Sequence, residues 1–257
     1  MAYRAFRRYG VDCVVGRDRR LALELSAALG PIAARSLVLV SDPETPRDLL
    51  AVDANECEGM SNVLTTTFTE ALEYARSHHA ADVRKGTRIP YVAHLLAVSS
   101  LVLEHGGSET AAIAALLHDV VEDGGGERAL AEIGERFGAE VAAIVEGCSD
   151  TTAAEKEDWR PRKEGYVTHL ASAPPDVLLV SAADKLHNAR SILGDLREHG
   201  DKLWTRFNAG PKDQLWYYGA LRDAFSLRLP GRLADELDRT VRDINRLACD
   251  LGRPTPL

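Results

Sequence analysis

The strongest constraint on the fold of this chain is the segment of residues 115 to 126, ALLHDVVEDGGG. Its first part continues an apolar run that begins near residue 111, which indicates a helix in the protein core. Four ionisable side chains then follow: His118, Asp119, Glu122 and Asp123. Residues four apart share a helix face, so each of the first two is expected beneath one of the last two. The three glycines at 124 to 126 are expected to end this helix.

Ionisable groups beside a core helix need compensation. Such groups are costly in a partly dry environment unless they are paired, and a divalent cation is a common partner. A single His-Asp pair can equally be a solvated helix end, because the chain contains eight histidines. The pair therefore indicates a metal site only if further ligands lie elsewhere in the sequence.

Two further residues qualify as ligands. His94 lies in the first turn of a helix that Pro90 is expected to start, and Asp184 interrupts an otherwise apolar helical run. Taken alone, His94 fits a core histidine and Asp184 fits a buried, paired carboxylate. Together with the His-Asp pair they form a mixed nitrogen and oxygen set, which suits manganese, iron or magnesium better than a thiolate-preferring metal.

The rest of the chain indicates an all-α bundle. Residues 62 to 250 carry one helical pattern after another, with a threonine cap at Thr69, a serine cap at Ser108 and two short helices around Gly138. We therefore expect a helical domain over residues 60–257. Residues 1–59 are expected to be an N-terminal extension of uncertain structure, in which DRRLALELSAALG resembles a helix and ARSLVLVSD a strand.

Composition narrows the classes of partner. The net charge of −8 argues against a nucleic-acid coat or a polybasic membrane anchor, so an anionic substrate must be met by local positive charge or by metal. No apolar run reaches the roughly 20 residues that span a bilayer. The four cysteines form no C-x-x-C pair, which favours a reducing cytoplasm. The sequence does not determine the oligomeric state.

Four segments in a fixed order resemble a known family: RKGTRIPYVAH, AALLHDVVED, RFGAEVAAIVEG and SAADKLHNAR. Over roughly residues 62 to 225 the chain resembles the HD superfamily of metal-dependent phosphohydrolases. The Glu-Asp pair after the His-Asp pair, and the Leu-His-Asn after the last aspartate, are similar to the hydrolase domain of RelA/SpoT homologues. The resemblance implies an HD-domain helical bundle.

The resemblance also implies a role for each matching residue. One manganese ion would be held by four ligands: His94, His118, Asp119 and Asp184. The attacking metal-bound water would be oriented and deprotonated by Glu122 and Asp123. The nucleotide would be bordered by Arg84, Lys85 and Tyr91, and Asn188 would contact its sugar or phosphate. Lys185 and Ser191 depart from the arginine and threonine that are common in the family, and this departure bears on base recognition.

The implied activity is removal of the 3′-pyrophosphate from an alarmone nucleotide such as (p)ppGpp or (p)ppApp. Two alternatives stay open: another HD nucleotide phosphohydrolase of the 5′-phosphatase type, and a catalytically silent nucleotide-binding regulator. The basic residues Arg160, Arg162 and Lys163 either approach a pyrophosphate or form a solvated helix face. The choice between guanine and adenine has no side-chain signature.

Overall fold

The computed structural model describes residues 64–122, 126–149 and 158–251, together with the backbone of three strands closer to the N-terminus. The chain divides into two compact units, Met1–Ser61 and Asn62–Leu257. In the first unit, β1 (Arg4–Arg8) pairs antiparallel with β2 (Val11–Gly16), and β2 pairs parallel with β3 (Leu37–Leu39). Strand β3 lies within the segment expected to contain a strand. The helix expected for DRRLALELSAALG falls outside the described residues.

The secondary-structure elements described in the second unit are all helices, apart from an isolated β-bridge between Val83 and Pro90, so the prediction of an all-α bundle is confirmed. Its helices are α3 (Thr66–His78), α4 (Val92–Glu104), α5 (Glu109–Leu117), α6 (Gly126–Phe137), α7 (Ala139–Cys148), α8 (Trp159–Leu170), α9 (Pro175–His199), the 3₁₀ helix η5 (Gly200–Arg206), α10 (Pro211–Arg228) and α11 (Arg232–Leu251). No helix in the described part of the chain is both long enough and apolar enough to cross a membrane.

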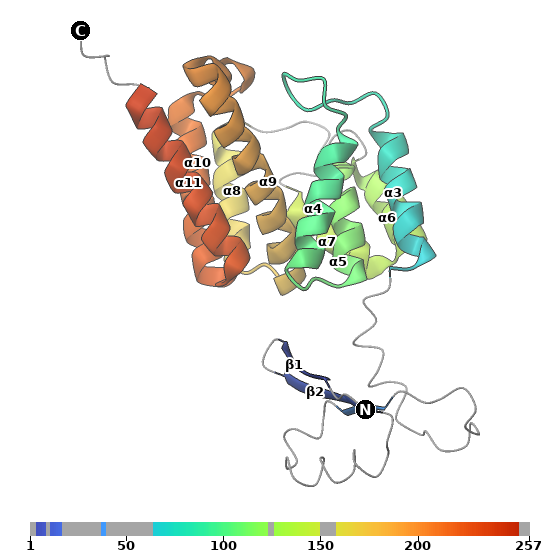
Figure 1. The fold of residues 1–257 in the computed structure, drawn as a ribbon. Helices are drawn as coiled ribbons and strands as arrows, with labels where there is room; N and C mark the ends of the chain where they lie inside the picture. The colour runs from blue at the N-terminus through green and yellow to red at the C-terminus, as the bar shows by residue number, and fades with distance from the viewer. Residues whose placement is uncertain are drawn as a thin grey trace. The chain divides into compact units, whose positions relative to one another are not determined.

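Helix α9 is the centre of the bundle (Figure 1). It packs against α4, α5 and α7 on one side and against α10 and α11 on the other. Twelve of its 25 residues are buried, because helices cover it on more than one face. Asp184 is among these buried residues, so a charged side chain lies in the middle of the core.

Helix α3 begins earlier than the sequence indicates. The Oγ1 of Thr65 accepts a hydrogen bond from the backbone nitrogen of Thr67, so Thr65 is the N-cap and Thr69 lies inside the helix. The prediction of a cap at Thr69 is therefore wrong, because an earlier threonine has the extended backbone that a cap requires. The serine cap is confirmed: the Ser108 hydroxyl accepts a hydrogen bond from the nitrogen of Ala111.

Helix α5 ends sooner than expected, at Leu117. The nitrogen of Val120 donates to the carbonyl oxygen of Leu117, which tightens the chain into a turn, and Val121 and Glu122 follow in a π-helical turn. The expectation that one regular helix continues to residue 123 is therefore wrong. Gly126 starts α6 rather than ending α5, with a φ of 53°. His118 and Asp119 consequently lie at the junction between two helices.

Candidate metal centre

Three buried side chains from distant parts of the sequence converge in the helical unit. Ligand atoms of His94, His118 and Asp184 all lie within 4.8 Å of one another. The Oδ1 atom of Asp184 is 3.2 Å from the Nε2 of His94 and 3.7 Å from the Nε2 of His118. This spacing leaves the three groups facing a common point, which is the arrangement that a bound cation requires.

Asp119 lies at the edge of the same cluster. Its Oδ2 atom is 3.1 Å from the Nε2 of His118 and 3.5 Å from the Nε2 of His94. Its side chain is 19% exposed, against 7% for Asp184, so Asp119 borders the solvent side. The structure thus brings together all four side chains that were predicted from the sequence to be metal ligands.

The fold explains this convergence. His94 lies in the first turn of α4, His118 and Asp119 follow the end of α5, and Asp184 lies in the middle of α9. Helix α9 packs directly against both α4 and α5. The buried packing of these three helices therefore positions the donors before any ion binds.

In each histidine of the cluster, Nε2 faces the other ligands, and the opposite ring nitrogen, Nδ1, contacts a group outside the cluster. The Nδ1 of His118 donates to the carbonyl oxygen of Ala115 at 2.8 Å, and the Nδ1 of His94 lies 2.8 Å from the Nδ1 of His187. The Nε2 atoms of His94 and His118 are buried and make no hydrogen bond within the described structure. A buried polar nitrogen without a hydrogen bond is costly, and metal binding would satisfy both.

The carboxylates are held in the same way by side chains outside the cluster. The Lys185 ammonium donates to Oδ2 of Asp184 at 2.6 Å, while the Asn188 amide donates to its Oδ1. The Tyr91 hydroxyl donates to Oδ2 of Asp119 at 2.6 Å. Oriented ligands of this kind are typical of metal sites in proteins.

The charges in the cluster shift one another's ionisation. Burial disfavours the ionised forms, but the neighbouring charges outweigh it: Asp119 raises the pKa of His118 well above its usual value, and Lys185 holds the pKa of Asp184 well below its own. The pKa of Asp119 is also lowered, mainly by His118 against the effect of burial. Both carboxylates are therefore ionised near neutral pH, as metal ligation requires.

The residues expected at the nucleotide form a chain of contacts that leads to this cluster. Arg84 donates to Oδ1 of Asn188, and its guanidinium lies 5.6 Å from the centre of the Tyr91 ring. Tyr91 and Asn188 in turn contact Asp119 and Asp184. Arg84, Tyr91 and Asn188 are therefore close to the cluster.

Lys85 lies farther along the same loop. Its Nζ is 3.5 Å from Oδ1 of Asn208 and 6.0 Å from the centre of the Phe207 ring, both in the segment that links η5 to α10. Gly86 follows with a φ of 75°, and a Cβ added there would lie 2.6 Å from the Cδ of Arg206. Glycine thus permits both the backbone conformation and the close approach of this loop to the end of η5.

Of the two expected proton acceptors, Glu122 is half-buried and its Oε1 lies 3.6 Å from the Nη1 of Arg162. Asp123 falls outside the described residues. Two arginines of α8 have different surroundings. Arg162 is 12% exposed and faces Glu122. Arg160 stacks on Trp216 and pairs with Glu164 at the surface.

Sequence reasoning assigned no role to His187, and noted Lys185 only as a departure from the family. Both contact proposed ligands directly. A usable signal was present, because residues 184, 187 and 188 are spaced i, i+3 and i+4 and must share one face of α9. The identity of their partners depends on which helix packs against that face.

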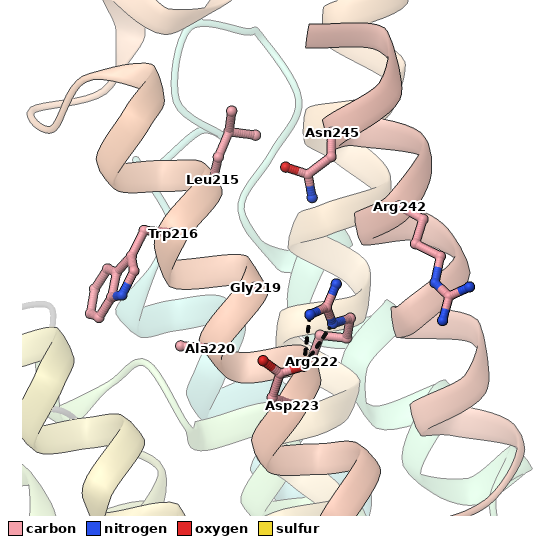
Figure 2. A pocket seen from close by; sticks show the side chains of 8 residues that line it. All are labelled: Leu215, Trp216, Gly219, Ala220, Arg222, Asp223, Arg242 and Asn245. Atoms are coloured by element: carbon pink, nitrogen blue, oxygen red, sulfur yellow. Dashed lines mark hydrogen bonds and ion pairs between the residues drawn. The ribbon is translucent and has the colours of Figure 1, made fainter. Parts of the chain in front are cut away.

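A hollow lies elsewhere in the helical unit, between α10 and α11 (Figure 2). It has a volume of about 590 Å³ and is lined by Leu215, Trp216, Gly219, Ala220, Arg222, Asp223, Arg242 and Asn245. Its two arginines already pair with carboxylates, Arg222 with Asp223 and Arg242 with Asp238. The hollow therefore has neither the buried donors nor the convergent geometry of the metal centre.

The fold and the site define a class of protein. A helical bundle with a histidine on one helix, a His-Asp pair after the next and an aspartate on a long central helix is the arrangement of an HD domain. The family model described as "HD domain" matches residues 71–214. This chain belongs to the HD domain family.

Relatives of the chain include proteins named for alarmone chemistry. It is 31% identical over 150 residues to the guanosine-3′,5′-bis(diphosphate) 3′-pyrophosphohydrolase MESH1 of Drosophila melanogaster, a match that covers 57% of this chain and 79% of that protein. It is 38% identical over 128 residues to a probable GTP pyrophosphokinase of Mycobacterium leprae. That second match covers 48% of this chain but only 15% of the longer protein.

Two solved structures have a fold similar to that of this chain. The chain superposes on a metazoan orthologue of SpoT, reported to hydrolyse ppGpp, with a TM-score of 0.58 and 27% identity over 71% of this chain and 97% of that one. A protein of Listeria monocytogenes superposes with a TM-score of 0.52 and 29% identity, over 60% of this chain and 99% of that one. Both solved chains are thus matched over nearly their whole length.

Proposed function

We propose that this protein is a manganese-dependent hydrolase that removes the 3′-pyrophosphate from alarmone nucleotides such as (p)ppGpp or (p)ppApp, with water as the nucleophile. The observation that carries the proposal is the convergence of His94, His118 and Asp184, with two buried Nε2 atoms that lack hydrogen bonds. The names of the relatives, including one matched over 79% of its length, support the choice of substrate.

We assign one divalent cation to His94, His118, Asp119 and Asp184. Two imidazoles and two carboxylates form a hard, mixed donor set that suits manganese, and Cys148, the buried free thiol nearby in the bundle, is not among these donors. When bound, such a cation lowers the pKa of water and neutralises phosphate oxygens. The oriented donors described above fit this role.

The remaining residues would handle the proton and the nucleotide. Glu122 follows His118 by four residues, in the π-helical turn after α5, and would accept the proton of the attacking water, together with Asp123. Arg162, 3.6 Å from Glu122, would hold that carboxylate in position. Arg84 and Lys85 would supply the local positive charge that an acidic protein needs to bind a polyphosphate.

Product analysis tests the proposal. Purified protein is incubated with manganese and a panel of guanine and adenine nucleotides, each with or without a 3′-pyrophosphate. We expect release of pyrophosphate from the 3′-pyrophosphorylated members alone. The same panel reports whether guanine or adenine is preferred.

Two other outcomes would replace the proposal. Release of orthophosphate from ordinary nucleotides would indicate a 5′-phosphatase of the same family. Tight binding of an alarmone with no manganese-dependent consumption would indicate a nucleotide-binding regulator. A Glu122→Gln variant tests the assigned proton acceptor, because it should lose turnover while retaining manganese affinity if Glu122 accepts the proton.

Residues 60–257 are proposed to form the hydrolase domain, with residues 1–59 as an extension, and a cytoplasmic location is part of the same proposal. No nucleic acid or membrane is expected among its partners, since the net charge is −8 and the expected substrate is a small nucleotide.

A further inference from the structure

His187 lies directly behind one of the proposed metal ligands. Its Nδ1 is 2.8 Å from the Nδ1 of His94, and the two rings are 4.9 Å apart between their centres. The opposite nitrogen of His94, Nε2, faces Asp184 at 3.2 Å and Asp119 at 3.5 Å. His94 therefore lies between the cluster on one side and His187 on the other.

Two ring nitrogens 2.8 Å apart share one proton, since two lone pairs or two N–H groups at that distance would repel. A neutral imidazole carries its proton on one nitrogen and a lone pair on the other. If the lone pair of His94 is on Nε2, where the cluster lies, its proton is on Nδ1 and points at His187. His187 must then accept through Nδ1 and carry its own proton on Nε2.

The two histidines of the cluster differ in how this tautomer is fixed. His118 donates from Nδ1 to the carbonyl oxygen of Ala115, which can only accept, so the backbone alone holds a proton on this nitrogen. The acceptor for His94 is instead a side chain from α9, 93 positions away. A single substitution at residue 187 can therefore change which ring nitrogen of His94 carries the proton.

We infer that His187 is a positioning residue that accepts the Nδ1 proton of His94 and so directs the Nε2 lone pair of His94 to the metal. This inference rests on the proposed metal site and adds a residue to it. His187 itself is not a ligand, because its Nδ1 is engaged with His94 on the side away from the cluster. Asp184 and Asn188 share its face of α9, so one helix supplies a ligand, a contact to that ligand and the partner of His94.

A matched pair of substitutions tests the inference. Asparagine places an acceptor oxygen close to the position of the histidine Nδ1, whereas leucine has nearly the same size and no acceptor. Manganese affinity of the full chain is measured by calorimetry for the parent, His187→Asn and His187→Leu. We expect the affinity to fall by about 10- to 100-fold in His187→Leu, as is usual when an outer partner of a metal ligand is lost, and to stay within a few-fold of the parent in His187→Asn.

Three results would overturn the inference while leaving the metal site intact. The first is a His187→Leu protein that binds manganese like the parent. The second is an equal loss of affinity in both variants, which would indicate that only the shape of the imidazole matters. The third is an equal loss of thermal stability in both variants that accounts for the loss of affinity. A parent that binds no manganese would instead contradict the proposed function.

Nitrogen-15 NMR of the unsubstituted protein provides an independent measurement that does not depend on the folding of a variant. In the diamagnetic zinc-loaded protein, we expect the His94 ring to carry its proton on Nδ1 and to bind through Nε2. We also expect His187 to carry its proton on Nε2 and to show no metal-induced shift of a bound nitrogen. A His94 ring that binds through Nδ1, or a metal-bound His187, would refute the assignment.

Discussion

The two carboxylate oxygens of Asp184 have different partners. Oδ1 faces His94 and receives the Asn188 amide, while Oδ2 receives the Lys185 ammonium at 2.6 Å. The lysine side chain is only 15% exposed, so this ion pair lies within the core. One aspartate thus serves the proposed metal and neutralises a buried cation, which ties the metal site to the stability of α9.

Asp184→Asn is predicted to weaken both manganese binding and the ion pair with Lys185. The substitution keeps the size of the side chain but removes its charge, so manganese affinity should fall at least about tenfold, which is about 1.4 kcal/mol of binding free energy. The protein should remain helical by circular dichroism, with a lower thermal midpoint because Lys185 loses its anionic partner. Calorimetric titration with manganese measures the first effect and thermal unfolding the second.

Asp195→Asn is the matched control on the same helix. Asp195 pairs with Arg206 near the surface and is 30% exposed, so its loss should change stability little and manganese affinity not at all. If Asp184→Asn bound manganese as tightly as this control, Asp184 would be a structural residue only.

Cys148 is predicted to be an unreactive thiol. Burial raises its pKa to about 11, so the thiolate fraction at pH 8 is on the order of one thousandth. Alkylation by iodoacetamide at pH 8 should therefore be much slower at Cys148 than at the exposed Cys249, and it should accelerate with pH up to about 11. Mass spectrometry of the two peptides over time measures the rates, and equal rates at pH 8 would contradict the prediction.

At the scale of the elements, a glycine sets how closely α7 approaches α9. A Cβ added to Gly147 would lie 2.7 Å from Cγ2 and 3.0 Å from Cγ1 of Val177. Val177 is buried and β-branched, so its side chain cannot turn aside easily. Gly194 is also helical, but a Cβ added there would meet no atom within 4 Å.

The two glycines are therefore predicted to respond to alanine with opposite signs. Alanine favours a helix over glycine by about 1 kcal/mol, so Gly194→Ala should raise the free energy of unfolding by roughly that amount. In Gly147→Ala the gain is outweighed by overpacking, which typically costs about 1–3 kcal/mol. Urea unfolding of both variants gives the comparison; stabilisation by both would mean that α7 and α9 separate without cost.

At the scale of the whole molecule, the two compact units differ in what they contribute. The candidate metal centre and the match to the HD family both lie within Asn62–Leu257. Helix α9 joins the two halves of this unit, because it packs against α4, α5 and α7 as well as α10 and α11 (Figure 1). Binding of a cation between α4 and α9 should therefore stabilise the helical unit as a whole.

A chain shortened to begin at Met60 is also predicted to be stabilised by manganese. Manganese at 100 times its dissociation constant should stabilise a folded site by about 2.7 kcal/mol, and a chelator should remove the effect. We expect the same manganese-dependent rise in thermal midpoint in the full and the shortened chain. Loss of the rise in the shortened chain alone would show that residues 1–59 belong to the hydrolase domain.

The sequence by itself determined the helical class, the order of most helices and the side chains that converge in the cluster. Helical periodicity, caps and glycines act over a few residues, so Ser108 and the break at Gly138 could be read directly. The motif around His118 and Asp119 is likewise local. The assignment of these side chains to manganese and to catalysis stays a prediction.

Only the tertiary structure decided where α5 ends and which groups hold the proposed ligands. The tight turn after Leu117 replaced the regular helix that the periodicity indicated. The contact of His187 with His94 joins residues 93 positions apart, and the contact of Arg162 with Glu122 joins α8 to the turn that follows α5. Such contacts depend on which helix faces pack together in space, and no short-range sequence pattern encodes that pairing.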